Sequence, residues 1–186
     1  QFTQQEALDL VRDSKITELE TENRTLQNAV KVSAKYDSTV TARVVSHSVH
    51  IASNRILVNK GLQDTIKVNQ VVLSDGLVVG VVHSATDNQA QIVLLDDQDF
   101  RLEVVFGENR GVLKGAVNGS IIDRVLPDVS VEKQQLVMTA GSRTVPANLP
   151  VGRVVGQLIT SEKVFQQLQF ATPVDLDRLS IVQVVR

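Results

Sequence analysis

The positions of glycine and proline divide this 186-residue chain into two regions. All ten glycines lie at or after Gly61, and all four prolines lie at or after Pro127. Because these residue types interrupt regular backbone structure most strongly, the part before Gly61 can form a long uninterrupted element. From Phe2 to about Lys35 it is a mixture of Glu, Gln, Lys, Leu, Ala, Asn and Thr, in which apolar residues recur three and four positions apart. This periodicity predicts one long helix.

The apolar stripe of the predicted helix has the spacing of a coiled coil. Its members are Ile16, Leu19, Asn23, Leu26 and Val30. β-Branched residues at the a positions, leucine at the d positions and a single asparagine at an a position are typical of a parallel two-stranded coil. We therefore expect residues 1–38 to pair with a second copy of the chain. The same stripe is also compatible with an amphipathic helix that packs on its own domain, so this alternative stays open.

From Thr39 onward the composition changes to that of strands and turns. Val, Ile and Thr make up nearly a third of this region, and glycines recur throughout it. We expect strands at 40–45, 55–58, 70–73, 77–83, 91–95, 102–106, 112–116, 120–125, 135–139, 152–160 and 180–185. Residues 161–169 alone resemble a second, short helix, and Ser74-Asp75-Gly76 predicts a tight hairpin in which Gly76 has positive φ.

The number of expected strands indicates two small barrels. One small closed sheet holds about six to eight strands, which is fewer than this region offers. We therefore expect a mainly β fold with a long N-terminal coiled-coil helix and two β-barrel-like subdomains, at residues 39–112 and 113–186. The boundary between the subdomains stays open, because strands of the two are free to interleave.

Composition excludes several classes of function. With 19 basic and 21 acidic residues and a formal net charge of −2, the chain lacks the positive charge with which proteins hold nucleic acids. The absence of cysteine excludes disulfides, zinc–thiolate sites and thiol nucleophiles. No apolar run approaches the roughly 18 residues that span a bilayer. Since the sequence begins at Gln1, we expect any membrane anchor to lie in a segment before it.

Three groups of segments carry a resemblance to a known family. Residues 57–80 read LVNKGLQDTIKVNQVVLSDGLVVG, with a Lys-Gly turn before an Asp-Gly hairpin. Residues 93–102 read VLLDDQDFRL and are continued by NRGVLKG at 109–115. Residues 138–141 read MTAG, and residues 145–154 read VPANLPVGRV. In this order they resemble the rod shape-determining protein MreC family, in which a coiled coil precedes the β region.

Four positions depart from the pattern of that family. Thr65, Asn69 and Asn148 stand where the family usually has glycine, and Ala140 stands where it has serine. Asparagine tolerates positive φ better than other residues with a side chain, so we expect both Asn replacements to preserve their turns. A β-branched residue is strained at positive φ, and we therefore expect the turn at Thr65 to differ.

The resemblance implies a function and a set of partners. It implies a non-catalytic, cofactor-free scaffold, anchored in the bacterial inner membrane and placed on its periplasmic face, that organises the cell-wall elongation machinery and maintains cell shape. The implied partners are a second copy of the chain, as a homodimer or a filament, and a class B penicillin-binding transpeptidase. The membrane protein MreD and, indirectly, the MreB filament complete the implied set.

Two alternatives to a cell-shape scaffold stay open. His83, Asp96 and Ser142 follow the chain order of a chymotrypsin-like serine hydrolase, although Ser142 lacks the Gly-Asp-Ser-Gly setting of such enzymes. The other alternative is a periplasmic β-barrel adaptor that is unrelated to cell shape.

The sequence predicts no metal site. His47 and His50 are three apart in an expected strand, whose alternation points them to opposite faces. Asp96, Asp97 and Asp99 lack the glycine and the glutamate of an EF-hand loop, so we interpret them as a solvated acidic loop.

The expected functional surfaces are therefore interfaces. Besides the helix stripe, the candidates are two loop regions, at residues 109–115 and 143–153. Their candidate contact residues are Asn109, Arg110, Arg143, Asn148 and Arg153. Ordinary exposed turns are the alternative interpretation of both regions.

Overall fold

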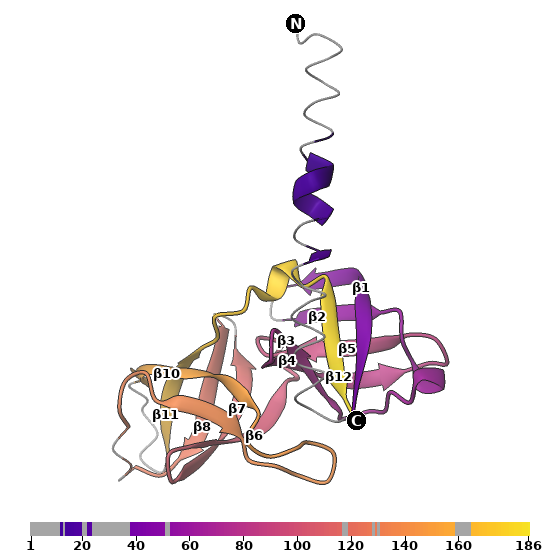
Figure 1. Cartoon of the computed structure of the whole chain (residues 1–186). Helices are drawn as coiled ribbons and strands as arrows, with labels where there is room; N and C mark the ends of the chain where they lie inside the picture. Colours follow the sequence, from indigo (N-terminus) through magenta and orange to yellow (C-terminus); the bar gives the residue numbers. More distant parts are fainter. Residues whose placement is uncertain are drawn as a thin grey trace, which may run out of the picture.

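The computed structural model contains two closed β-barrels that lie side by side (Figure 1). It describes residues 12, 14–19, 22–23, 38–50, 53–116, 119–127, 129, 131–158 and 165–186. The first barrel has the strand order β1-β12-β3-β4-β5-β2, and the second has the order β10-β11-β8-β7-β6-β9. The prediction of a mainly β fold with two small barrels is confirmed.

The chain enters the first barrel, builds the second and then returns to close the first. The first barrel consists of β1 (Thr39–His50), β2 (Ser53–Val58), β3 (Val71–Ser74), β4 (Leu77–Ala85), β5 (Ala90–Leu94) and β12 (Ile181–Val185). The second consists of β6 (Arg101–Phe106), β7 (Asn109–Ala116), β8 (Gly119–Val125), β9 (Leu136–Thr139), β10 (Pro150–Leu158) and β11 (Gln166–Ala171). The expected division after residue 112 falls inside β7, and β12 belongs to the first barrel. The two subdomains are thus interleaved, and the boundary at 112 and 113 is corrected.

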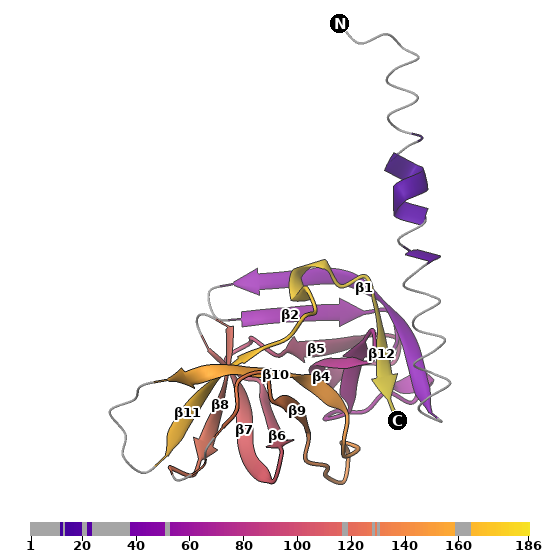
Figure 2. The ribbon, with the colours of Figure 1, turned by 60° about the vertical axis from the view of Figure 1, so that its left-hand side comes forward.

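Closure of the first barrel depends on strands from opposite ends of the β region. β12 pairs with β1 in a register that places Thr39 opposite Val185, and it pairs with β3 on its other side. In Figure 2, β12 and the C-terminus lie beside the beginning of β1. The backbone N–H of Arg186 donates to Ser38 O at 2.9 Å, which extends this pairing by one bond.

Residues 166–169, the second half of one expected helix, form a strand instead. Residues 161–169 were expected to be helical, but β11 begins at Gln166, and its side chains alternate between buried and exposed from Leu168 to Ala171. Leu168 and Phe170 point into the second barrel, while Gln169 points outward. The apolar residues two positions apart are the pattern of a strand with one buried face.

The turns follow the expectations at Gly76 and at both asparagines but not at Thr65. Asp75 and Gly76 have φ values of 50° and 82°, as a tight hairpin between β3 and β4 requires. Asn69 and Asn148 also have positive φ, at 69° and 63°. Thr65 ends the 3₁₀ turn η1 (Leu62–Asp64) with φ 69°, so the expectation that it would avoid this conformation is wrong. Its backbone N–H donates to Leu62 O at 3.0 Å, which closes the turn despite the branched side chain.

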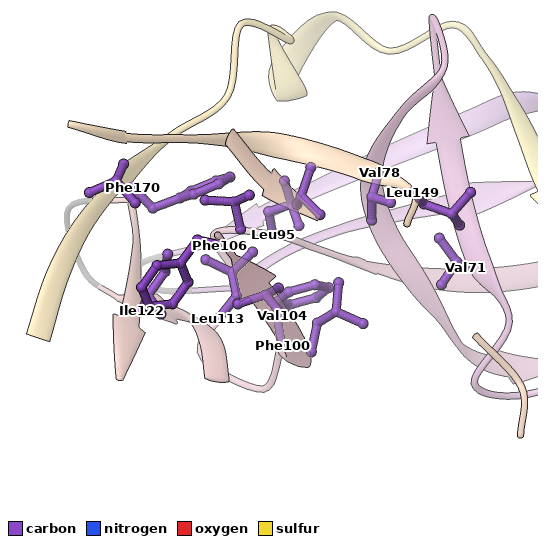
Figure 3. Packing of buried hydrophobic residues seen from close by; sticks show 14 of the residues in the cluster. Val71, Val78, Leu95, Phe100, Val104, Phe106, Leu113, Ile122, Leu149 and Phe170 are labelled. Carbon is purple, nitrogen blue, oxygen red and sulfur yellow. The ribbon is translucent and has the colours of Figure 1, made fainter. Parts of the chain in front are cut away.

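Strands β3, β4 and β5 are buried on both faces and join the barrels into one body. Val72 and Val79 point into the first barrel, whereas Val71, Leu73 and Val78 belong to the core of the second. Figure 3 shows Leu149, from the loop between β9 and β10, beside Val71 and Val78. Apolar runs such as Val71-Val72-Leu73 are typical of strands covered on both sides. The interface between the barrels is therefore a hydrophobic core.

The described residues of the N-terminal region are helical. Residues 14–19 lie away from both barrels in Figures 1 and 2, and Ile16 and Leu19 are about half exposed. Glu22 connects this region to the first barrel through an ion pair with Arg43 of β1 at 2.7 Å. Leu26 and Val30 lie outside the described residues, so the long coiled-coil helix stays a prediction. Within the described part of the chain, no helix has the length and hydropathy needed to cross a membrane.

Candidate functional site: the inter-barrel junction and the loop surfaces

Two connecting segments join the barrels, and both meet the beginning of β2. Residues 95–100 lead from β5 to β6, and residues 172–180 lead from β11 to β12. The second segment contains the 3₁₀ turn η2 (Leu176–Arg178), drawn in yellow, which lies against β1 and β2 in Figures 1 and 2. We call the polar residues gathered here the junction cluster: Ser53, Asn54, Arg55, Asp96, Asp97, Asp99 and Asp177.

Asp97 is the buried centre of the junction cluster. Its side chain is 1% exposed, and its Oδ2 accepts hydrogen bonds from Ser53 Oγ at 3.0 Å and from the Asn54 backbone N–H at 2.9 Å. Arg55 Nε also donates to this oxygen, at 3.2 Å. The interpretation of the aspartate loop as solvated is therefore wrong for Asp97, although Asp99 is 65% exposed. Asp97 holds the first connecting segment to β2.

Arg55 supplies the opposite charge for this buried carboxylate. Its guanidinium also forms an ion pair with Asp99, on the solvent side of the loop. The Asp99 backbone N–H donates to Asp97 Oδ1 at 2.8 Å, so both oxygens of Asp97 are satisfied. A buried charge is tolerated when it is paired and fully hydrogen-bonded, which is the situation of Asp97.

Asn54 connects the two segments to each other. Its Nδ2 donates to Asp96 Oδ2 at 3.1 Å and to Asp177 Oδ1 at 3.3 Å. Burial raises the pKa of Asp96, the hydrogen bond from Asn54 opposes this rise, and the charges of Asp177 and Asp97 add to it. Asn54 therefore bridges carboxylates that belong to different connecting segments.

The second barrel leaves no space between itself and the first connecting segment. A Cβ atom added to Gly115 of β7 would lie 2.0 Å from Asp97 O, so only glycine fits there. Ser120 of β8 donates from its Oγ to Leu95 O at 2.9 Å. Together with the shared core, these contacts fix how the two barrels are arranged.

The candidate contact residues lie in separate parts of the second barrel. Asn109 and Arg110 begin β7 directly after its hairpin with β6, and Arg110 is exposed. Arg143 and Asn148 are exposed in the loop between β9 and β10. Arg153 lies within β10, and its guanidinium donates to Gln134 O at 3.0 Å. Their role as contact residues stays a prediction.

The loop between β9 and β10 also covers a pocket between the barrels. The pocket has a volume of about 270 Å³. Val81 and Asn69 of the first barrel line it together with Leu102 of β6 and Ser142 and Val145 of the loop.

The hydrogen bonds of the described residues do not assemble the serine hydrolase triad. Asp96 bonds to Asn54 in the junction cluster, whereas Ser142 lies in the loop between β9 and β10, where its backbone N–H donates to Val145 O at 2.7 Å. His83 is exposed on β4 and does not line the pocket to which Ser142 contributes. The chain order of these three residues is thus not matched by contacts among them.

The other histidine pair shows no metal-binding arrangement in the described part of the chain. His47 Nε2 lies 3.0 Å from Leu179 O, and the side chain of His50 lies outside the described residues. Among the described residues, no group of three or more His, Cys, Asp or Glu side chains could hold a metal ion.

Sequence reasoning missed the partners of the aspartate loop. Asn54, Arg55 and Asp177 were not singled out, because each is far in sequence from Asp96 and Asp97. The one available signal was the polar run Ser53-Asn54-Arg55 at the start of β2. Asn54 lies on the same buried face of this strand as Ile56 and Val58.

Comparison with known proteins identifies the family. A model described as "Rod shape-determining protein MreC, barrel core" matches residues 44–186. A solved structure described as "MreC" superposes with a TM-score of 0.80 at 21% identity, covering 90% of this chain and 99% of that chain. MreC from Pseudomonas aeruginosa gives a TM-score of 0.70 at 22% identity, covering 81% of this chain and 100% of that chain.

A further match is MreC from Helicobacter pylori, solved in a complex with Penicillin-Binding Protein (PBP2). It gives a TM-score of 0.64 at 13% identity and covers 80% of this chain and 98% of that chain. These structural likenesses show that the fold is shared. A search of curated proteins by sequence gave no match. Because the family model covers most of the chain, including both barrels, the chain belongs to the rod shape-determining protein MreC family.

Proposed function

We propose that this chain is the periplasmic part of a non-catalytic scaffold that organises the cell-wall elongation machinery and maintains cell shape. The observation that carries the proposal is the match to the barrel core of the MreC family over residues 44–186. The construction of the molecule supports it, because the polar side chains of the junction cluster are engaged in holding two barrels together. A scaffold of this kind acts by presenting a fixed surface to its partners.

The first proposed partner is a class B penicillin-binding transpeptidase. Support comes from the MreC of Helicobacter pylori, whose structure was solved in a complex with PBP2. The resemblance to the family adds MreD and, indirectly, the MreB filament as proposed partners. The shared hydrophobic core of the barrels favours binding with little rearrangement.

The second proposed partner is another copy of the chain. The helix stripe is suited to this role, because Ile16 and Leu19 are 53% and 51% exposed and would be covered in a coiled-coil dimer. Filaments would need a further contact between barrels of neighbouring copies. We place the membrane anchor of this scaffold in a segment that precedes the helix.

Binding of the purified chain to the class B transpeptidase of the same cell tests the partner proposal. We expect a complex by biolayer interferometry, weakened about tenfold by Arg110→Glu or by Arg143→Glu, since each reverses an exposed charge of a candidate contact loop. Arg178→Glu is the matched control, because Arg178 is 86% exposed and lies on η2, outside both loops. No binding by the unmodified chain would contradict the partner proposal. Unchanged binding by both loop variants would contradict the proposed surface.

A further inference from the structure

The pocket between the barrels lies where β9 separates from β6. β9 pairs with Val104 and Val105 of β6, and one more bond runs from the Ala140 backbone N–H to Glu103 O at 3.0 Å. Gly141 then has positive φ, at 87°, and the loop between β9 and β10 turns away from β6. In Figure 1 this loop, drawn in orange, projects from the second barrel toward the first. The pocket therefore lies along the line in which β9 would otherwise continue.

The first residue of β6 has an open backbone edge at this pocket. The hairpin between β6 and β7 pairs Phe106 with Asn109, so every second residue of β6, counted back from Phe106, bonds to β7. These residues are Phe106, Val104 and Leu102. The backbone N–H and C=O of Arg101 point the other way, to the side of β9, where β9 has no residue opposite Arg101. Since Arg101 lines the pocket, an unpaired donor and an unpaired acceptor of a strand edge face it.

The rest of the pocket lining suits an extended polypeptide. Its apolar part comes from Leu102, Val81 of β4 and Val145 of the loop, and both valines pack against the shared core. The loop also contributes Ser142 and Thr144, whose hydroxyl groups have no hydrogen-bond partner within the described part of the chain. A strand has polar backbone groups along both edges and points its side chains to one face and then the other. Such a strand can bond to β6 on one edge and to the hydroxyl groups on the other, with one apolar side chain against the valines.

We propose that this pocket binds an extended segment of a partner polypeptide, which adds to β6 as a short antiparallel strand. The segment continues the line of β9, which is itself antiparallel to β6. Its residue opposite Arg101 exchanges two backbone hydrogen bonds with Arg101. The preceding residue then lies opposite Leu102 and points its side chain into the apolar lining. A short aliphatic side chain such as that of valine suits the pocket volume of about 270 Å³.

Charges on β6 favour one order of residues in the segment. The Arg101 guanidinium donates to Gln98 O and Phe100 O, both at 2.6 Å, but it pairs with no carboxylate among the described residues. Residues directly opposite each other in an antiparallel pair lie on the same face, so an acidic residue opposite Arg101 would meet this guanidinium. Glu103 lies on that face two positions along, and it disfavours a second acidic residue there. The expected pattern is therefore an aliphatic residue followed directly by an acidic one.

Amide exchange of the whole chain, followed by NMR, tests the proposal with a synthetic peptide. The probe is the acetylated and amidated peptide Ser-Thr-Val-Glu-Thr-Ser. In the free chain, the Arg101 amide is expected to exchange at least about tenfold faster than the Leu102 amide, which bonds to β7. A saturating concentration of the probe is expected to slow exchange at Arg101 at least about fivefold and to leave Leu102 unchanged. The peptide Ser-Glu-Val-Thr-Thr-Ser has the same composition and is expected to bind at least about threefold more weakly.

Two changes separate backbone pairing from side-chain contacts. Methylation of the glutamate backbone nitrogen of the probe keeps its side chains but removes the donor to Arg101 O, and is expected to weaken binding at least about tenfold. Arg101→Pro removes the N–H that faces the pocket, at the first residue of a strand, where proline is tolerated. It is expected to weaken binding at least about tenfold, whereas Arg101→Gln, the matched control, is expected to weaken it about threefold or less. Both variants lose the guanidinium, but only glutamine keeps the N–H.

Four results would overturn the proposal. The first is an Arg101 amide that is protected in the free chain at every concentration, because the strand edge is then closed. The second and third are unchanged amide shifts at about 5 mM probe and equal binding of the methylated probe. The fourth is protection of Arg101 that rises with the concentration of the chain alone, which shows that a second copy occupies the pocket. A chain that binds the transpeptidase but not the probe contradicts this inference and leaves the proposed function standing.

Discussion

Asp97 is the single residue on which the junction between the barrels depends most. It is buried, it accepts four hydrogen bonds, and it is paired with Arg55. Asp99 is only two residues away but is 65% exposed, so water shares its contact with Arg55. Asp97 therefore contributes much more to the stability of the fold than Asp99, although both belong to the same loop and bind the same arginine.

Replacing Asp97 by alanine is therefore expected to be severe. Asp97→Ala leaves two backbone N–H groups without their acceptor and leaves Arg55 with the exposed Asp99 as its ion-pair partner. We expect this to lower the free energy of unfolding by about 3–5 kcal/mol. The matched variant Asp99→Ala is expected to cost about 1 kcal/mol or less, because exposed ion pairs contribute little. Urea unfolding followed by circular dichroism measures both. An equal loss of unfolding free energy in the two variants would show that burial does not make Asp97 more stabilising than Asp99.

At the scale of elements, closure of the first barrel depends on the short strand β12, which pairs with β1 and β3. Five residues at the end of the chain close the first barrel, and all five are buried. Val182 and Val184 point into the first barrel, while Val185 packs in the core shared with the second. Without β12, β1 and β3 would become open edges, which are prone to pairing with other chains.

Truncation tests this role of β12. A chain that ends at Ser180 is expected to lose its cooperative thermal transition and to aggregate in size-exclusion chromatography. A chain that lacks only Arg186 loses one backbone hydrogen bond, to Ser38, and is expected to keep its Tm within a few degrees, roughly 2–4 °C. A monomeric chain ending at Ser180 with the Tm of the full chain would contradict closure by β12.

The elements also differ in how well local pattern predicts them. β3 and β4 were predicted because the Asp75-Gly76 hairpin fixes where β3 ends and where β4 begins. Residues 161–169 were predicted to be a short helix, but residues 166–169 belong to β11. Burial in the barrel overrides the local helical interpretation.

At the scale of the whole molecule, the predicted coiled coil would join two copies of the chain into a dimer. Ile16 and Leu19 are exposed in the described helical residues, and the ion pair from Glu22 to Arg43 places the helix next to β1. A dimer formed through the helix would therefore hold two pairs of barrels at the end of one coiled coil.

Disruption of the helix stripe tests the dimer. Leu19→Asp combined with Leu26→Asp places charge at two d positions and is expected to convert a dimer into a monomer in analytical ultracentrifugation. Thr17→Asp combined with Thr25→Asp is the control, since it adds the same charge outside the a and d positions. The Tm of the barrels is expected to stay unchanged in both variants. An unchanged mass in the first variant would contradict the coiled coil.

The sequence by itself determined the local features of this protein. The change in composition at Thr39 separated the helical region from the β region, local pattern located most strands, and Asp75-Gly76 fixed a hairpin, because each depends on neighbouring residues alone. Tertiary structure decided the rest: which strands close which barrel, that Asp97 is buried, and that Asn54 meets Asp96 and Asp177. These outcomes depend on pairs such as Thr39 and Val185, which are brought together only when the sheet closes. Closure is set by the packing of the whole barrel, and no short stretch of sequence encodes it.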